Sequence, residues 1–300
     1  MRLVTYDTGA GTPRRVGVLR DDAVIDCEFD GDMVAFVEAG DAALAAARAA
    51  LSSGSAVAEA RLRAPIRPRT LRDFLTFPEH TERSRAALGL GPIPQLWYEV
   101  PAYYKGLPDT VIGPEEEIPW PSYSDQLDQE LEIACVIGRP GRDIARDDWR
   151  EHVFGWTIWN DMSARDTQGR ELPLGMGPGK AKDWDGSNVL GPCIATADEC
   201  DGADAEMALW INGEERTRAR SSQMHHSFGD LIAYASLACT LRAGEVIGSG
   251  TAPGGAGIET GQYLAPGDLI EMEIEGIGTL RNRVGTRPEN HVGTPTRENA

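Results

Sequence analysis

The sequence lacks the cysteine patterns of a disulfide-bonded or zinc-binding protein. Its five cysteines are an odd number at wide spacings, and none forms a Cys-x-x-Cys pair, so neither a disulfide framework nor a zinc knuckle is indicated. Long apolar runs are also missing, since the stretch 42–51 is short, contains Arg48 and cannot span a bilayer. Residues 1–7 contain no apolar signal core. We therefore expect a cytoplasmic protein with reduced thiols.

Positive charge is scarce relative to negative charge. The chain has 29 Lys and Arg residues against 47 Asp and Glu residues, which gives a formal net charge of −18. A strongly acidic surface repels the phosphates of nucleic acids and the headgroups of anionic lipids. We expect a small-molecule substrate and no nucleic-acid or membrane partner. An anionic substrate would need local Lys or Arg residues, or a metal ion.

Strand-like segments outnumber helical ones, and strict alternation of strands with helices is absent. Helices are predicted over 41–52, 81–88 and 228–241, and the last begins with the capping-box spacing of Ser227 and Asp230. Asn212-Gly213 predicts a hairpin turn. Strands are predicted over 3–6, 15–19, 23–27, 130–138, 154–161, 207–212, 245–249 and 269–275. The pattern predicts an α+β, mostly β protein.

Proline residues suggest where the chain divides. Pro65 and Pro68 are typical of a linker after a short segment of strands and one helix. We predict a small α/β N-terminal domain over 1–65 and a larger catalytic domain over 66–285. The end of the chain, 286–300, is rich in Gly, Pro, Thr and Asn and is expected to be a loose tail.

Two glutamates lie in a segment that otherwise looks buried. Glu130 and Glu132 are two residues apart, so in a strand they point to the same side, and apolar residues follow at 133–137. Buried like charges need a cation. Asp161 ends the second predicted buried strand, and carboxylate oxygens favour a hard ion such as Mg²⁺, Mn²⁺ or Ca²⁺. Alternatively, the Glu-x-Glu pair lines the solvated face of an edge strand.

Several blocks of sequence resemble, in order and spacing, the fumarylacetoacetate hydrolase family over 70–285. The blocks are 128–138 (DQELEIACVIG), 159–168 (WNDMSARDTQ), 190–194 (LGPCI) and 248–251 (GSGT). The resemblance implies a mixed β-roll or β-barrel catalytic domain. It also implies Glu130, Glu132 and Asp161 as ligands of Mg²⁺ or Mn²⁺, with Ca²⁺ able to take their place in crystals. Asp73, seven residues before His80, is implied as a further ligand.

The resemblance also implies a general base. His80 is similar to the family histidine that activates water, a task suited to a pKa near neutrality. Glu259, after the Gly-rich loop 250–257, is similar to the glutamate that orients this histidine in hydrolase-type members. Other members place a glutamate three residues after the histidine, where this chain has Arg83, and Glu82 remains the alternative partner.

Further residues are implied to bind the substrate or stabilise the enolate. Lys182 is similar to the family lysine at this point, with Lys180 as the competing candidate. Two substrate contacts of the family are replaced by Leu75 and Gly89, which argues against fumarylacetoacetate itself. The resemblance also implies a homodimer, since family members commonly form one, and the aromatic-rich stretch 94–104 is expected at the interface. Implied substrate-binding residues are Tyr104, Gln168 and Thr251.

These expectations together describe a metal-dependent hydrolase that cleaves a carbon–carbon bond in a small β-diketo acid, either an acylpyruvate or a fumarylacetoacetate-like compound. The alternative within the family is a decarboxylase, isomerase or hydratase of 2-oxo acids in aromatic-compound catabolism, because a fold does not determine a reaction. The third possibility, a non-catalytic protein of the same fold, is disfavoured by the complete set of site residues.

Overall fold

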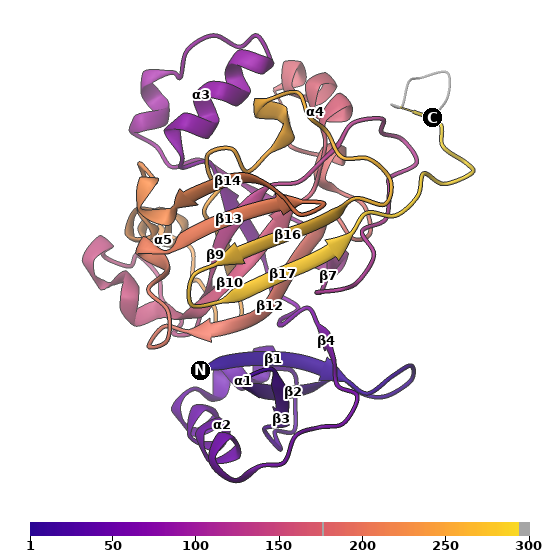
Figure 1. The fold of residues 1–300 in the computed structure, drawn as a ribbon. Helices are drawn as coiled ribbons and strands as arrows, with labels where there is room; N and C mark the ends of the chain where they lie inside the picture. Colours follow the sequence, from indigo (N-terminus) through magenta and orange to yellow (C-terminus); the bar gives the residue numbers. More distant parts are fainter. Residues whose placement is uncertain (176, 294–300) are drawn as a thin grey trace.

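The described residues form a main sheet of eleven strands (Figure 1). The computed structural model describes residues 1–175 and 177–293. The strands are β1 (Arg2–Asp7), β2 (Arg15–Arg20), β3 (Ala23–Asp26), β4 (Arg61–Arg63), β5 (Leu71–Phe74), β6 (Tyr103–Gly106), β7 (Val111–Ile112), β9 (Leu131–Ile137), β10 (Val153–Asp161), β12 (Asn188–Thr196) and β15 (Val246–Gly248). Their order is β3, β2, β1, β12, β10, β9, β15, β5, β6, with β4 beside β1 and β7 beside β12.

A second, antiparallel sheet packs against the first. Its order is β14 (Glu214–Arg220), β13 (Glu206–Ile211), β16 (Leu269–Ile274) and β17 (Gly278–Arg283), while β8 (Leu127–Asp128) and β11 (Ser163–Ala164) form a separate pair. The α+β, mostly β class is thereby confirmed. The expected barrel is not closed in the described residues, because the end strands β3 and β6 of the main sheet do not pair.

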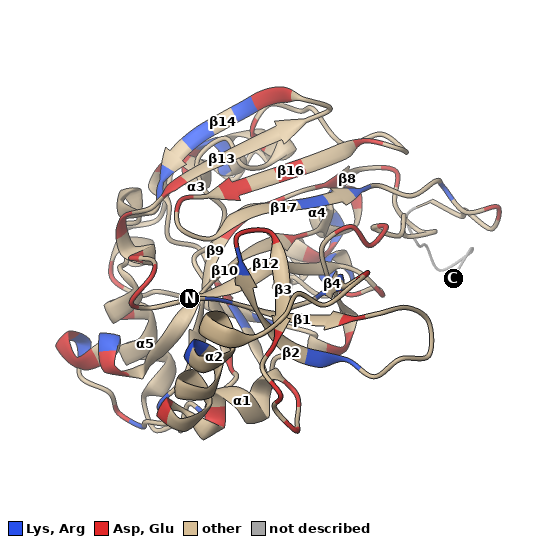
Figure 2. Ribbon diagram, turned by 60° about the horizontal axis from the view of Figure 1, so that its bottom comes forward, with Lys and Arg blue, Asp and Glu red and all other residues tan. Residues whose placement is uncertain are grey.

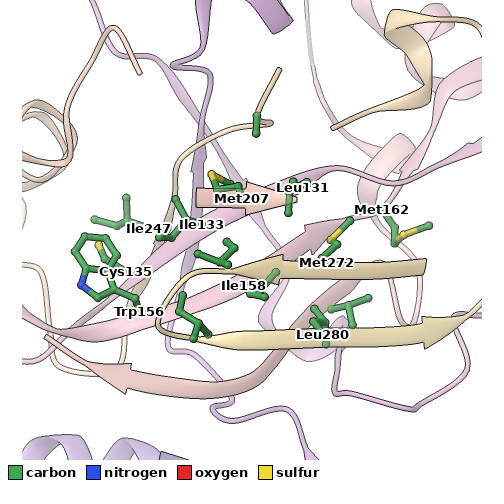
Figure 3. Packing of buried hydrophobic residues seen from close by; sticks show 14 of the residues in the cluster. Leu131, Ile133, Cys135, Trp156, Ile158, Met162, Met207, Ile247, Met272 and Leu280 are labelled. Atoms are coloured by element: carbon green, nitrogen blue, oxygen red, sulfur yellow. The ribbon is translucent and has the colours of Figure 1, made fainter. Parts of the chain in front are cut away.

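Strand β9 forms the centre of the molecule because both of its faces are buried. Leu131, Ile133 and Cys135 face the core between the two sheets, while Ala134 and Val136 face the core on the other side. This follows from the alternation of side chains along a strand. Figure 3 shows side chains of β9 and β10 meeting those of β13, β16 and β17 between the sheets. The edge-strand alternative for the Glu-x-Glu pair is therefore wrong.

In the part of the chain that the structure describes, five α-helices lie around the sheets: α1 (Met33–Ala39), α2 (Asp41–Ser53), α3 (Pro78–Ala87), α4 (Arg165–Glu171) and α5 (Phe228–Ser236). Figure 1 places α3 and α4 at the end of the molecule away from α1 and α2. No helix in the described ranges is long and apolar enough to cross a bilayer. The predicted base His80 lies in α3, and α4 follows the predicted metal ligand Asp161 in the sequence. Both therefore belong to this end of the molecule.

Helix α5 ends five residues earlier than its sequence pattern predicts. Leu237 leaves the helix with φ −56° and ψ 116°, and Ala238 has a positive φ of 52°. Asp143, from a distant loop, accepts a hydrogen bond from the backbone N–H of Ala238 at 2.7 Å. This tertiary contact stabilises the turn, so the prediction of a helix through residue 241 was wrong.

The N-terminal segment continues the main sheet, since Arg2 and Leu3 of β1 pair with Ala195 and Ile194 of β12. The domain boundary near residue 65 stays a prediction. Residues 286–293 contain no helix or strand, and the rest of the predicted tail lies outside the described residues.

The Asp and Glu residues are spread over many parts of the fold. Figure 2 shows Asp and Glu along several helices and loops, with Lys and Arg also on β14. On that strand, Arg218 pairs with Glu206 and Glu215. Exposed ion pairs of this kind each contribute about 1 kcal/mol or less, so the stability of the fold depends mainly on the two cores.

The capping box of α5 generates a stability prediction. Ser227 accepts a hydrogen bond from the Asp230 N–H, and the Asp230 carboxylate accepts one from the Ser227 N–H at 2.8 Å. Ser227→Ala should lower the free energy of unfolding by about 1 kcal/mol, measured by urea denaturation. Ser55→Ala, at an exposed loop serine, is the matched control, and equal losses in the two variants would contradict a capping role.

Candidate active site

Four buried carboxylates meet where the central strands of the main sheet end. Glu130 precedes β9, Glu132 lies in it, Asp161 ends β10 and Asp73 lies in β5. Strand β9 pairs with β10 on one side and with β15 on the other, and β15 pairs with β5. One potential ligand atom from each of the four residues lies within 4.8 Å of the others. The sheet topology thus joins residues that are far apart in the sequence.

This acidic cluster (Asp73, Glu130, Glu132 and Asp161) has the properties of a cation site. Glu132 Oε2 and Asp161 Oδ1 are buried and have no hydrogen-bond partner among the described residues. Burial, and then the charge of Asp161, raises the pKa of Asp73 to about 8, and burial and the Asp73 charge raise the pKa of Glu132 well above its usual range. Buried carboxylates without partners are unfavourable. An all-oxygen set of this kind suits a hard divalent cation, so the cluster could hold one.

Lys182, rather than Lys180, contacts this acidic cluster. Lys182 lies in the 3-10 helix η5 (Lys180–Lys182), and its Nζ donates to the carboxylates of Glu130 and Asp161. Burial lowers the pKa of Lys182, but the two carboxylates outweigh this effect and raise it above the usual value. Lys180 is exposed and donates to the main-chain oxygen of Asp183. Lys182 therefore places a permanent positive charge beside the cation site.

A second buried cation, Arg165, was not singled out from the sequence. Its guanidinium donates to Asp128 Oδ2 at 2.7 Å, to Glu130 Oε1 at 2.6 Å and to Gln168 Oε1 at 2.9 Å. Both Asp128 and Arg165 lie within the sequence blocks that carry the family resemblance, but linear spacing gives no sign that they pair. Arg165 therefore links Gln168, a predicted substrate-binding residue, to Glu130 of the acidic cluster.

His80 and Glu259 form a buried pair beside the cluster. His80 lies in the first turn of α3, and Glu259 ends the 3-10 helix η8 (Gly257–Glu259). His80 Nδ1 lies 2.8 Å from Glu259 Oε1, and the Gly254 N–H donates to both oxygens of that carboxylate at 3.0 and 2.9 Å. Arg83 lies 3.4 Å from the second oxygen. Burial raises the pKa of Glu259, but these donors outweigh it and bring the pKa below its usual value.

This geometry orients the imidazole. An ionised Glu259 accepts a hydrogen bond, so it favours the tautomer with the proton on Nδ1 and leaves Nε2 as the basic nitrogen. Glu82, the alternative partner, is exposed on α3 and has no contact with His80 in the described residues. The arrangement can abstract a proton at Nε2 and keep the resulting imidazolium paired with Glu259.

A pocket of about 390 Å³ joins the base to the acidic cluster. Its polar side includes Asp73, His80, Glu130, Arg165, Gln168, Lys182 and Thr251. Tyr104 also lines it and donates a hydrogen bond to Asp161 Oδ2 at 2.6 Å, and Thr251 Oγ1 lies 3.4 Å from Glu132 Oε1. The structure thus brings together all ten residues that the sequence indicated for catalysis, substrate binding and metal binding.

Of the wall of this pocket, sequence reasoning indicated only Tyr104. Pro94, Trp97 and Tyr103, within the stretch expected at a dimer interface, also line the pocket. The aromatic composition of the stretch was a usable signal, because binding pockets are lined mainly by apolar and aromatic side chains. The homodimer itself stays a prediction.

Comparison with known proteins gives the context of this site. The profile described as "Fumarylacetoacetate (FAA) hydrolase C-terminal" matches residues 69–285. The mitochondrial oxaloacetate tautomerase FAHD2A of Homo sapiens is 31% identical over 293 residues, which cover 94% of this chain and 88% of that protein. Among solved structures, the fumarylacetoacetate hydrolase of Exiguobacterium antarcticum is 29% identical with a TM-score of 0.79, covering 96% of this chain and 100% of that chain.

A third relative performs another reaction. The 5-carboxymethyl-2-hydroxymuconate delta-isomerase of Mycobacterium smegmatis is 28% identical with a TM-score of 0.73, and the match covers 95% of this chain and 100% of that one. The names of these relatives therefore differ in reaction while the fold is shared. The profile match spans most of the chain and includes every residue of the site described above, so the chain belongs to the fumarylacetoacetate hydrolase family.

Proposed function

We propose that the protein is a divalent-metal-dependent hydrolase that cleaves a carbon–carbon bond in a small β-diketo acid. The observation that carries this proposal is the buried His80–Glu259 pair beside a pocket that is lined by His80 and by Asp73 and Glu130 of the acidic cluster. A base held in one tautomer and a cation site on the same pocket are the two parts that water activation at a chelating carbonyl compound needs.

In this proposal, Mg²⁺ or Mn²⁺ is held by Asp73, Glu130, Glu132 and Asp161. When bound, the ion would supply Lewis-acid polarisation of a 2-oxo acid. Gln168, Thr251 and Tyr104 bind the substrate from the walls of the pocket.

His80 performs the proton transfers. Its Nε2 takes a proton from water, and the hydroxide adds to the carbonyl carbon remote from the carboxylate. The bond between this carbon and the neighbouring methylene then breaks, giving a carboxylic acid and the enolate of a 2-oxo acid. Lys182 stabilises the developing negative charge. The proton on His80 passes to the methylene carbon, so the net reaction consumes one water molecule.

Tautomerisation of a 2-oxo acid is a second candidate. It is favoured by the relative named as an oxaloacetate tautomerase, which matches nearly the whole chain. The same His80–Glu259 pair could take a proton from the carbon beside the 2-oxo group and give it to the enolate oxygen, or carry it in the reverse direction, without water as a reactant. The two candidates share the base and differ in whether a carbon–carbon bond breaks.

The base generates an activity prediction. His80→Ala should abolish turnover, and Glu259→Gln should reduce kcat/KM about 100-fold to 10,000-fold, because general acid–base catalysis contributes about that much. The assay follows loss of the enol absorbance of acylpyruvates with Mg²⁺, while oxaloacetate is tested in parallel for enol–keto exchange and for release of CO₂.

The matched control is Glu82→Gln, which changes an exposed carboxylate on the same helix and should leave kcat/KM within about twofold. Cleavage products that disappear in Glu259→Gln support the hydrolase. Enol–keto exchange without cleavage products identifies the tautomerase. An active His80→Ala variant would show that another group is the base, whichever reaction is catalysed.

The acidic cluster generates a binding prediction. Loss of a residue that only supports a metal ligand weakens metal binding roughly 10- to 100-fold. Because Glu132 is proposed to bind the ion directly, Glu132→Gln should weaken Mg²⁺ binding, measured by calorimetry, by more than this. Added Mg²⁺ should raise the Tm of the wild-type protein but not that of the variant. Glu82→Gln again serves as the control and should bind normally, and unchanged affinity in Glu132→Gln would remove this cluster as the metal site.

The raised pKa of Asp73, about 8, and that of Glu132 generate a pH prediction. Without metal, these carboxyls stay protonated in the folded chain above the pKa of about 4 that they have when unfolded. Their contribution to stability is therefore present below pH 4 and is lost as the pH rises through about 8.

Metal binding shows the opposite trend, because it requires the ionised carboxylates. We expect the affinity for Mg²⁺ to rise between about pH 6 and about pH 8, with release of protons. Calorimetry in two buffers with different ionisation enthalpies measures both quantities. Affinity that is flat across this range, with no proton release, would contradict the raised pKa values.

A further inference from the structure

The pocket has two chemically different halves. One half is the polar side described above. The other half is apolar and is formed by segments outside the central strands, with Leu75, Leu88, Leu90, Trp97, Tyr103 and Leu172 as its main members. Three of these leucines remain substantially exposed, Leu75 at 40%, Leu90 at 46% and Leu172 at 36%. Exposed leucines gathered around one pocket favour an apolar ligand that covers them.

The cationic groups that line the pocket are already engaged. Lys182 is paired with Glu130 and Asp161, and Arg165 with Asp128 and Glu130. His80 is paired with Glu259. None of these charges faces the apolar half without a partner, so they offer no counter-ion to a second carboxylate placed there.

Arg85 also lines the pocket and forms no ion pair within the described residues, but its guanidinium is held by main-chain oxygens. Its Nε donates to the main-chain oxygens of Gly91 and Pro92, both at 3.1 Å, and its Nη2 donates to that of Leu90 at 2.6 Å. These bonds organise the chain after α3 and so support the position of Leu90. Releasing the guanidinium for a ligand would leave carbonyl groups without donors, which costs free energy.

We propose that the end of the substrate remote from its 2-oxo acid group is an uncharged apolar chain or ring that lies on this wall. The inference rests on the proposed function, which places the 2-oxo acid group at the polar half. It names the substrate class as 2-oxo or 2,4-diketo acids with an alkyl or aryl substituent, and it disfavours substrates that end in a second carboxylate. Each methylene buried on the wall strengthens binding about fourfold, while a carboxylate buried there without a partner weakens it.

The test compares two ligands of equal length that differ only at the remote end. Calorimetry with the full chain and Mg²⁺ measures Kd for 2-oxooctanoate, which ends in a methyl group, and for 2-oxooctanedioate, which ends in a carboxylate. Pyruvate reports on the shared oxo-acid group alone. We expect 2-oxooctanoate to bind at least roughly tenfold more tightly than 2-oxooctanedioate and than pyruvate. Equal or tighter binding of 2-oxooctanedioate overturns the inference.

Failure of the proposed function gives a different result. If neither pyruvate nor either long 2-oxo acid binds in the presence of Mg²⁺, the assignment of the polar half to a 2-oxo acid is wrong, and the inference falls with it. If the ligands bind without the expected preference, the proposed function stands and the apolar wall alone is refuted.

A charge introduced on the wall provides the matched variant. Leu90→Lys places an ammonium group beside the bound chain, so it should reduce the preference for 2-oxooctanoate at least several-fold. Leu107→Lys is the control, because Leu107 has a similar exposure of 44% but does not line the pocket. An unchanged preference in Leu90→Lys, or an equal change in Leu107→Lys, would show that the remote end does not lie on this wall.

Discussion

The constraint on which the site depends is the burial of like charges at the centre of the main sheet. Asp73, Glu130, Glu132 and Asp161 converge there, and two buried cations, Lys182 and Arg165, contact only part of the set. Charges in such an environment are unfavourable unless paired. The cores on both faces of β9 must therefore offset their cost, and a bound cation would relieve it. The pKa values of Asp73 and Glu132 are raised because both carboxyls are buried beside other carboxylates, and the charges of Lys182 and Arg165 do not outweigh this effect.

The base is placed by the same network although it belongs to other elements. Asp128 pairs with Arg165 and also accepts hydrogen bonds from the N–H groups of Gly257 and Ile258 at 2.7 and 3.0 Å. Those residues begin the turn that ends in Glu259, which in turn contacts His80. One chain of buried contacts thus runs from Glu130 to the imidazole. Because catalysis depends on such relative positions, Asp128 and Arg165 matter to the geometry without touching the reacting atoms.

Sequence reasoning was most successful where local pattern and burial agree. The apolar run after Glu130 predicted β9, and Ser227 with Asp230 predicted the start of α5. It failed where a distant contact decides. The Asp143 carboxylate ends α5 early. The choice of Lys182, which is buried against two carboxylates, over exposed Lys180 came from the family resemblance, because nothing in the local sequence distinguishes the two. The site residues came from the order of family blocks, since Glu-x-Glu alone favours a solvated strand.

The division of the pocket explains how one fold can accept different substrates. The acidic cluster lies on strands β5, β9 and β10 or directly beside them, where the packed sheet permits little change. The apolar wall comes from the chain after α3, the short helix at 95–98 and the segment after α4, which contribute few residues to the core. Segments of this kind tolerate substitution better than central strands do. Relatives at about 30% identity can therefore share the fold of the polar half while differing in the wall. The names of relatives therefore say more about the chemistry at the polar half than about the substrate of this protein. The substrate depends on wall residues such as Leu90 and Trp97.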